Sequence, residues 1–182
     1  MPPPKIICRS ISEEGKKMEL FSVHEYREPL IEKIIEQFKF RGGKPLARLM
    51  AKEMIRMIDK EEISDVVFIP IPLHWTRKIW RGYNQSEALL MAIKKENPRI
   101  KIQTRGLKRI RKTAQQSKLN REERLKNLQN AFEWQGEEIP QKIVLLDDVI
   151  ATGSTLLGAA EALKKAGCQK VYGLTFAYGS GR

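Results

Sequence analysis

Two adjacent carboxylates and a hydroxyl-rich turn lie close together near the carboxyl end of the chain. Asp147 and Asp148 follow the apolar segment 143–146, and a turn that contains Gly153 follows them. If a helix begins at this turn, its backbone N–H groups and partial positive charge favour a phosphate dianion. Carboxylates repel phosphate, so we expect the two aspartates to accept hydrogen bonds from vicinal sugar hydroxyls and to help hold a divalent cation. The pattern therefore predicts a site for a phosphorylated sugar.

Either half of this pattern alone has an ordinary explanation. An Asp-Asp pair is common in solvated turns, and Thr-Gly-Ser is an ordinary helix cap. Both halves together, at the end of a strand, are harder to explain in this way, and we interpret them as one functional unit. Other phosphate-binding loops do not match, because Gly42-Gly43-Lys44 continues into Pro45 and the chain contains no G-x-G-x-x-G.

The elements that position these residues are an apolar strand and an amphipathic helix. Ile143 to Leu146 favours a strand covered on both faces, whose end places Asp147 and Asp148 at the rim of a sheet. Gly153 to Ala166 favours a helix that stops at Gly167. Further helices are expected over 27–40, 44–58, 86–95 and 120–128, and further strands over 66–69, 100–104 and 171–177, after an arm or short strand pair over 1–22. This alternation predicts an α/β fold with a mostly parallel, doubly wound sheet.

Length and composition predict a single globular domain. The chain has 182 residues, of which 41% are hydrophobic, enough for a full core. The N-terminal sequence shows no apolar signal region and no stretch approaches a membrane span, so we expect a cytoplasmic protein with reduced thiols and no membrane insertion. Cys8 and Cys168 form no C-x-x-C pair, and His24 and His74 are scattered. A structural zinc site needs about four such ligands at close spacing, so we expect no zinc.

Four ordered motifs resemble one known superfamily over roughly residues 20–178. Leu146–Thr155 resembles the phosphoribosyl pyrophosphate (PRPP) motif of type I phosphoribosyltransferases. The remaining motifs are similar to the ComF/GntX branch, namely Phe68–His74 with Arg81–Glu87, Arg109-x-Arg111-x-Thr113-x-x-Gln116, and Arg124-x-x-Asn127 with Ala131-Phe132. The resemblance implies one phosphoribosyltransferase-like domain over 1–182, with an N-terminal arm and helices over 1–60. The PRPP-binding core is then expected over 61–182, with a mobile hood over about 100–130.

The resemblance also implies a role for each part of the motifs. Asp147 and Asp148 are expected to hold the ribose 2′ and 3′ hydroxyls and, together with Arg111, to be the catalytic residues. The 5′-phosphate is expected at Ala151, Thr152, Gly153, Ser154 and Thr155, and the pyrophosphate at Leu73, His74, Trp75, Thr76 and Arg77.

Magnesium is the cofactor that the resemblance implies. In such enzymes the bond between C1 and pyrophosphate breaks with oxocarbenium character, and Mg²⁺ with basic side chains stabilises the leaving group. The metal arrives with PRPP, so Asp147 and Asp148 are expected to contact it only through sugar hydroxyls or water. Full-length ComF relatives often begin with a four-cysteine zinc module, which this sequence does not contain.

Positive charge is concentrated in one part of the sequence. Lys and Arg total 34 against 22 acidic residues, and segment 99–126 holds eleven basic residues but only two acidic ones. Pyrophosphate needs fewer cations, so this surplus favours a larger polyanion. Aromatic and basic residues also alternate over 75–83, as in platforms for single-stranded nucleic acid, unless Trp80 and Tyr83 pack in the core and the lysines are merely solvated. The expected DNA-binding residues are Arg105, Lys108, Arg109, Arg111 and Lys112.

Three functions stay open. ComF-like proteins are associated with natural transformation, so the leading hypothesis is a PRPP-binding protein of the DNA-uptake machinery. Single-stranded DNA and a DNA-uptake helicase are then candidate partners, and transferase activity is open. The alternative is a metabolic phosphoribosyltransferase that transfers phosphoribose from PRPP to a nucleobase or an amine. The third is a protein that senses PRPP without turnover. The sequence identifies neither the acceptor nucleophile nor the oligomeric state.

Overall fold

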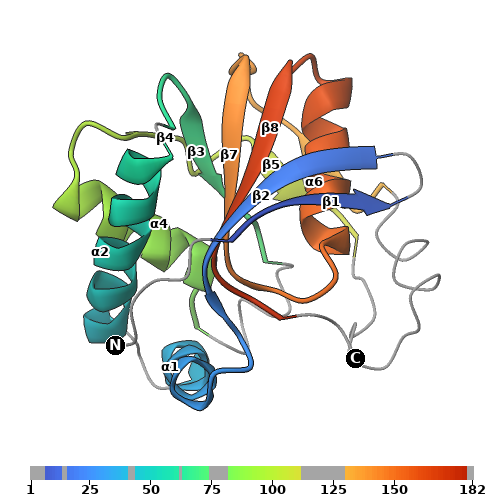
Figure 1. The fold of residues 1–182 in the computed structure, drawn as a ribbon. Helices are drawn as coiled ribbons and strands as arrows, with labels where there is room; N and C mark the ends of the chain where they lie inside the picture. The colour runs from blue at the N-terminus through green and yellow to red at the C-terminus, as the bar shows by residue number, and fades with distance from the viewer. Residues whose placement is uncertain are drawn as a thin grey trace.

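The structure is a computed structural model that describes residues 7–13, 16–40, 44–61, 63–73, 82–111 and 130–179 (Figure 1). Its strands are β1 (Ile7–Glu13), β2 (Lys16–Glu25), β3 (Val67–Pro70), β4 (Lys101–Ile102), β5 (Leu107–Arg109), β6 (Phe132–Trp134), β7 (Lys142–Ile150) and β8 (Lys170–Tyr178). Its helices are α1 (Pro29–Phe40), α2 (Lys44–Lys60), α4 (Gln85–Glu96) and α6 (Ser154–Lys165).

Six of the strands form one twisted sheet in the order β1-β2-β8-β7-β3-β4. Each neighbouring pair in this sheet is parallel except the first, in which β1 is antiparallel to β2. Helix α4 connects the neighbouring strands β3 and β4, and α6 connects β7 and β8. Parallel neighbours need such crossovers, so the α/β fold with a mostly parallel, doubly wound sheet is confirmed.

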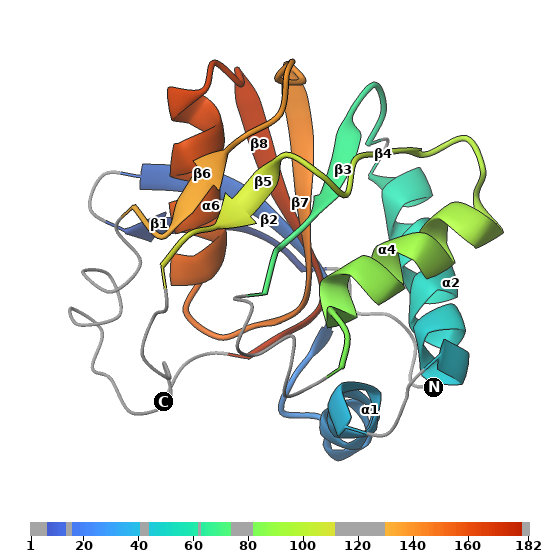
Figure 2. The ribbon, with the colours of Figure 1, turned by 180° about the vertical axis from the view of Figure 1, so that it is seen from behind.

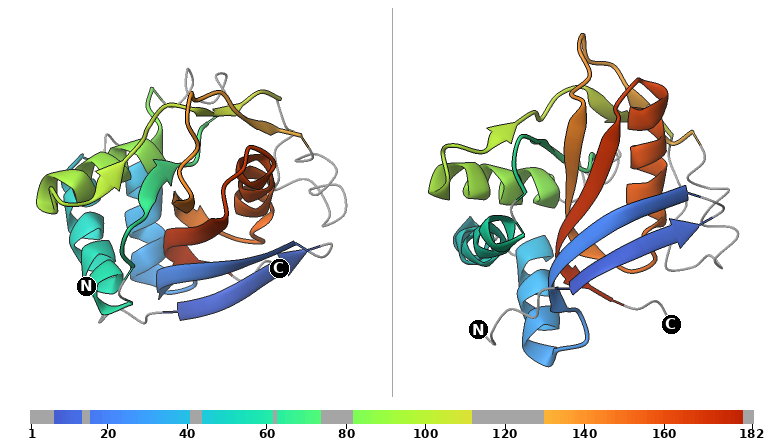
Figure 3. Two further views of the ribbon diagram at one scale, coloured as in Figure 1. Left: turned by 90° about the horizontal axis from the view of Figure 1, so that it is seen from above. Right: turned by 45° about the horizontal axis from the view of Figure 1, so that its top comes forward.

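Helices cover both faces of the sheet (Figure 3). Helices α2 and α4 pack on one face, with α1 at the lower end of the sheet in Figure 1. Ile31, Ile35 and Phe38 of α1 and Met50 and Met54 of α2 are fully buried there, as their helical spacing predicts. The opposite face carries α6 and the small β5–β6 sheet, which Figure 2 shows from behind.

The N-terminal segment contributes more to the fold than the expected arm or strand pair. Strand β1 does pair with β2, but β2 also pairs in parallel with β8 from Glu19 to Glu25. It therefore belongs to the central sheet. Local sequence patterns cannot reveal such a pairing, because the two partners are far apart along the chain.

Two strand boundaries also differ from the expectations. Strand β7 does not end before the aspartates but continues to Ile150, because β8 keeps pairing with it as far as Tyr178. Strand β4 is limited to Lys101–Ile102, shorter than the expected strand over 100–104. The helix expected over 120–128 lies outside the described residues.

No described helix has the length and apolar composition that crossing a membrane requires.

Candidate functional site

The acidic pair lies where the sheet loses one of its strands. Strand β3 pairs with β7 as far as Pro70 and Leu146, and the last contact is the Ile71 N–H donating to the Leu146 carbonyl at 2.9 Å. Beyond that point β3 leaves the sheet, whereas β7 continues beside β8 through Asp147 and Asp148. The aspartates therefore lie at the carboxyl edge of a parallel sheet, where ligands of α/β folds bind.

Asp147 is held by two hydrogen bonds to one of its oxygens. Its Oδ1 accepts from the Ser86 hydroxyl at 2.7 Å and from the Asp148 backbone N–H at 2.9 Å. Burial of the carboxyl group and the adjacent charge of Asp148 raise the pKa of Asp147 to about 7, although both hydrogen bonds and Lys39 act in the opposite direction. Asp147 can therefore gain or lose a proton near neutral pH.

Asp148 is only 6% exposed and has one oxygen in an unusual environment. Its Oδ1 accepts from the Val149 N–H at 2.8 Å. Its Oδ2 is buried and receives no hydrogen bond from the described residues, although the Lys39 ammonium lies 3.6 Å away. A buried acceptor without a donor is costly, so Oδ2 is a position where a ligand hydroxyl would gain a strong partner.

The start of α4 places the Ser86 hydroxyl. Asn84 is the N-cap of this helix, and its side chain accepts from the Ser86 N–H at 3.2 Å. The same side chain donates to the Ile71 carbonyl at 3.1 Å. Asn84 thus connects the exit of β3 to the first turn of α4. Both residues lie within the motif Arg81–Glu87, from which no role was predicted for either. The N-cap pattern Asn84-x-Ser86 is the signal that could have found them.

The turn between β7 and α6 contains a glycine in a left-handed conformation and two hydroxyl groups. Gly153, the N-cap of α6, has φ 92°, a left-handed conformation that glycine adopts without strain. The hydroxyls of Thr152 and Ser154 lie 2.9 Å apart. Ser154 is buried, Thr155 is half-buried and Ala151 is exposed. The first N–H groups of a helix have no intrahelical acceptors, so α6 presents donors beside the acidic pair.

The other expected site residues are divided between two regions. Leu73 is half-buried three residues after the end of β3, whereas His74, Trp75, Thr76 and Arg77 lie outside the described residues. Arg105, Lys108 and Arg111 are exposed on or beside β5, which belongs to the second sheet. The Arg109 guanidinium lies 5.4 Å from the centre of the Phe132 ring, and Lys112 lies outside the described residues.

Tyr83 packs within the protein, as the alternative to a stacking platform predicts. Its ring meets that of Phe38 edge to face at 6.2 Å between centroids, and its hydroxyl donates to the Phe38 carbonyl. The other aromatic and basic residues of the expected platform, over 75–81, lie outside the described residues.

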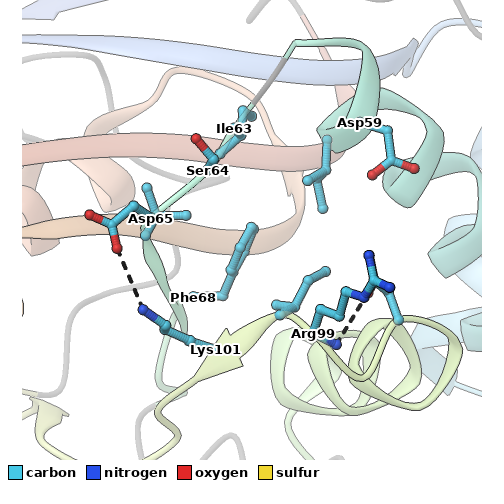
Figure 4. Close-up of a pocket in the computed structure, with 11 residues that line it drawn as sticks. Asp59, Ile63, Ser64, Asp65, Phe68, Arg99 and Lys101 are labelled. Atoms are coloured by element: carbon cyan, nitrogen blue, oxygen red, sulfur yellow. Dashed lines mark hydrogen bonds and ion pairs between the residues drawn. The ribbon is translucent and has the colours of Figure 1, made fainter.

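A cavity of about 360 Å³ lies at the opposite edge of the sheet (Figure 4). It is located before the start of β3, and Figure 4 shows Asp65 and Lys101 paired at its wall, with 3.4 Å between Oδ1 and Nζ. Both side chains are largely exposed, so this pair is well screened by water. Its remaining lining residues are Ile58, Asp59, Ile63, Ser64, Val66, Phe68, Asn97, Arg99 and Ile100. The cavity is separate from the acidic pair.

Comparison with known proteins agrees with this geometry. The family model "Phosphoribosyl transferase domain" matches residues 41–181. Competence protein F of Haemophilus influenzae is 32% identical over 157 residues, which cover 80% of this chain and 66% of that protein. DNA utilization protein YhgH of Salmonella typhimurium is 29% identical over 92% of this chain and 76% of its own length.

A third relative shows the same similarity. Competence protein ComFC of Streptococcus pneumoniae is 29% identical over 90% of this chain and 70% of its own length. This chain therefore spans about two thirds to three quarters of the length of these relatives. The matched family segment contains the acidic pair, the glycine turn and the Asn84–Ser86 segment that supports them. The chain belongs to the type I phosphoribosyltransferase family, in its ComF-like branch.

Proposed function

We propose that this protein binds PRPP together with Mg²⁺ at the carboxyl edge of the sheet. The observation that carries the proposal is the buried Asp148 Oδ2, which receives no hydrogen bond from the described residues, on a strand that continues through a left-handed glycine into the N-terminus of α6. A ribose supplies adjacent hydroxyl donors, and its 5′-phosphate supplies the anion. PRPP therefore satisfies both halves of the site with one molecule.

The ribose end of the site consists of Asp147 and Asp148. A hydroxyl that donates to Asp148 Oδ2 replaces a missing hydrogen bond, and a hydroxyl that donates to Asp147 favours the ionised form of that carboxyl group. The 5′-phosphate is received by the segment 151–155 and by the first N–H groups of α6.

The carboxylates suit an indirect magnesium contact. Carboxylate oxygens and water are the ligands that Mg²⁺ prefers, but Asp147 Oδ1 already accepts two hydrogen bonds. Asp148 Oδ2 can accept from a metal-bound water or from a sugar hydroxyl next to the metal. When bound with PRPP, Mg²⁺ neutralises pyrophosphate charge and makes it a better leaving group.

We further propose a role in DNA uptake or use, with single-stranded DNA as the nucleic-acid ligand. Relatives are named for competence and DNA utilization, and the chain carries a net charge of +12. The exposed side chains of Arg105 and Lys108 provide cations on and beside β5. Arg109 is partly engaged with Phe132, so it is a weaker candidate for phosphate contacts.

Calorimetric titration of PRPP, with and without Mg²⁺, tests the first proposal. Wild-type protein should show saturable, Mg²⁺-dependent binding, and Asp148→Asn should weaken it about 10- to 100-fold because an ionic acceptor is lost. Asp65→Asn is the matched control, since Asp65 is exposed at the opposite edge of the sheet and asparagine tolerates its positive φ of 49°. Equal affinity of wild type and Asp148→Asn would contradict the assignment.

Turnover is tested on the same protein with a panel of nucleobases and amines. Formation of a phosphoribosylated product would identify a metabolic transferase, whereas PRPP binding with only slow hydrolysis would favour a sensor or a component of DNA handling. Product analysis by mass spectrometry distinguishes these results.

Binding of a labelled single-stranded oligonucleotide across a salt series tests the DNA proposal. Arg105→Ala combined with Lys108→Ala should reduce the salt slope by about 1.4 if each side chain neutralises one phosphate. Lys52→Ala combined with Lys95→Ala, which removes two exposed cations on α2 and α4, is the control for net charge. Absence of binding even at low ionic strength would refute the DNA proposal.

A further inference from the structure

The last turn of α1 lies beside the acidic pair although it is remote from it in sequence. In Figures 1 and 2, α1 lies at the carboxyl edge of the sheet, next to the first turn of α4. Lys39, near the end of α1, places its Nζ 3.6 Å from Asp148 Oδ2. The Lys39 side chain is 20% exposed and that of Asp148 is 9% exposed. The pair is therefore far less screened than an ion pair on the surface.

The carbonyl groups at the end of α1 are occupied by the segment that begins α4. The Tyr83 hydroxyl donates to the Phe38 carbonyl, and the Gln85 side chain donates to the Lys39 carbonyl at 3.4 Å. The last carbonyls of a helix have no partners within the helix, so these two bonds fix its C-terminal turn. The rings of Phe38 and Tyr83 pack edge to face at the same junction.

The short segment 83–86 therefore holds the surroundings of both carboxylates of the acidic pair. Ser86 holds Asp147 directly through its hydroxyl, and Tyr83 and Gln85 hold the backbone from which Lys39 reaches Asp148. Asn84 connects this segment to the exit of β3. A shift of the segment would change the surroundings of both carboxylates together.

Charge explains why a lysine is useful at this point. PRPP carries several negative charges, and two neighbouring carboxylates repel it. An ammonium group beside Asp148 offsets this repulsion and leaves the carboxylate oxygens available to sugar hydroxyls. Because lysine carries a compact charge with three donors on a flexible stem, it can hold Asp148 and also reach a ligand oxygen.

We propose that Lys39 is a positioning residue of the sugar-phosphate site, held by Tyr83 and Gln85 so that its ammonium fixes Asp148 and offsets the charge of the ligand. The inference rests on the proposed PRPP site and extends it to a helix that the matched family segment, residues 41–181, does not include. Lys39 acts by holding Asp148 and by its positive charge, and it takes part in no chemical step.

The ion pair is tested first in the protein without ligand. Unfolding is measured by denaturant titration for wild type, Lys39→Met, Asp148→Asn and the double variant. The loss of stability in the double variant should be smaller than the sum of the two single losses, because each single change breaks the same interaction. Additive losses would overturn the pairing of Lys39 with Asp148.

The positioning role is tested by PRPP titration in the presence of Mg²⁺. Lys39→Met should weaken binding at least tenfold, Lys39→Arg should restore part of the affinity, and Lys33→Met should leave it unchanged. Lys33 is exposed on the same helix, so its replacement makes the same change of net charge. Wild-type affinity in Lys39→Met would overturn the proposal.

Tyr83→Phe tests whether the junction acts through Lys39. The change removes the hydroxyl that donates to the Phe38 carbonyl but keeps the ring. It should weaken PRPP binding in the wild-type background and have no further effect in Lys39→Met. An equal effect in both backgrounds would show that Tyr83 acts independently of Lys39 and would refute the arrangement proposed.

The two measurements separate failure of this inference from failure of the PRPP site. If wild-type protein binds no PRPP, the proposed ligand and the positioning role are both wrong, and the unfolding experiment alone decides whether Lys39 and Asp148 form a pair. If wild type binds PRPP and Lys39→Met binds equally well, only the inference about Lys39 is wrong.

Discussion

The two edges of the central sheet carry ion pairs of similar length in opposite surroundings. At the amino edge, Lys101 and Asp65 are 3.4 Å apart and are 69% and 79% exposed. At the carboxyl edge, Lys39 and Asp148 are 3.6 Å apart and are 20% and 9% exposed. Water screens the first pair, whereas burial strengthens the second and makes loss of one partner costly. The distance between the two charged groups of an ion pair is thus a poor guide to function, and the burial of the charged atoms is a better one.

The two edges also differ in the features that could bind a ligand. The amino edge has a cavity of about 360 Å³ whose lining combines apolar side chains with exposed charges. The carboxyl edge has the carboxyl with the raised pKa, the buried oxygen without a donor and the left-handed glycine. A polar ligand could satisfy the buried oxygen at the carboxyl edge, so these features favour the proposed site over the cavity.

The largest difference between the edges is expected when the cation of each pair is removed. Lys39→Met should lower the free energy of unfolding by about 3 kcal/mol, because it leaves a buried carboxylate unpaired. Lys101→Met should change it by less than about 1 kcal/mol. Denaturant titrations at neutral pH measure both values. Equal losses would show that burial does not distinguish the two pairs.

Two glycines with positive φ, at the two ends of α6, give the next comparison. Gly153 has φ 92° at the carboxyl edge, and Gly167 has φ 105° after the end of the helix. Alanine at either position should cost about 1 to 2 kcal/mol of stability because of backbone strain. At position 153 its Cβ would also lie 3.0 Å from Ile11.

PRPP titration separates the two glycine variants. Only Gly153→Ala should weaken PRPP binding, because only this turn belongs to the proposed phosphate site. Equal affinity of the two variants would place the phosphate elsewhere.

The raised pKa of Asp147 predicts a pH-dependent stability. The folded protein keeps the proton of this carboxyl up to about pH 7, whereas the unfolded chain loses it near its ordinary pKa of 3.8. Between these values the folded state binds more protons, so this group's contribution to stability falls as pH rises, by at most about 1.4 kcal/mol per pH unit. Above about pH 7 the contribution is constant.

Asp147→Asn isolates this effect. The difference in unfolding free energy between wild type and the variant should change with pH from about 4 to 7. Denaturant titrations at several pH values provide the test, and a pH-independent difference would show that the pKa of Asp147 is ordinary.

The smallest expected effect concerns two serines at opposite edges. Ser86→Ala removes the hydroxyl that donates to Asp147 at 2.7 Å and should cost about 1 kcal/mol. It should also raise the pKa of Asp147 further, because this hydrogen bond lowers it. Ser64→Ala, exposed at the cavity, should stay within about 0.5 kcal/mol of wild type. Thermal unfolding compares the two variants, and similar losses would remove Ser86 as a specific support.

Sequence patterns predicted the elements that have strong local periodicity. Helices α1, α2, α4 and α6 and strands β3 and β8 lie close to their expected positions, and β7 begins close to its expected start but ends four residues later than expected, because apolar spacing and glycine stops are local signals. The short strands β5 and β6 were not expected, since three residues with charged members show no clear alternation. The course of β2 beside β8 was not expected either, because it is a long-range pairing.

In the candidate site, too, the sequence predicted the parts that are local and not those that depend on long-range packing. The aspartates and the glycine turn are contiguous in sequence, so their types and spacing could be interpreted before the fold was known. Lys39 and Ser86 reach the aspartates only through the arrangement of α1 and α4 around the edge of the sheet. No periodicity near Lys39 distinguishes it from Lys33, the other cation of α1. Such contributions become visible only when the chain is folded.

The position of β2 and α1 bears on where this domain can be divided. The matched family segment begins at residue 41, after both elements. A chain shortened to that segment would leave β8 with an open strand edge, which invites pairing with other chains. It would also lose the only described cation within ion-pair distance of Asp148. The smallest unit that can be studied as an intact site therefore includes β2 and α1.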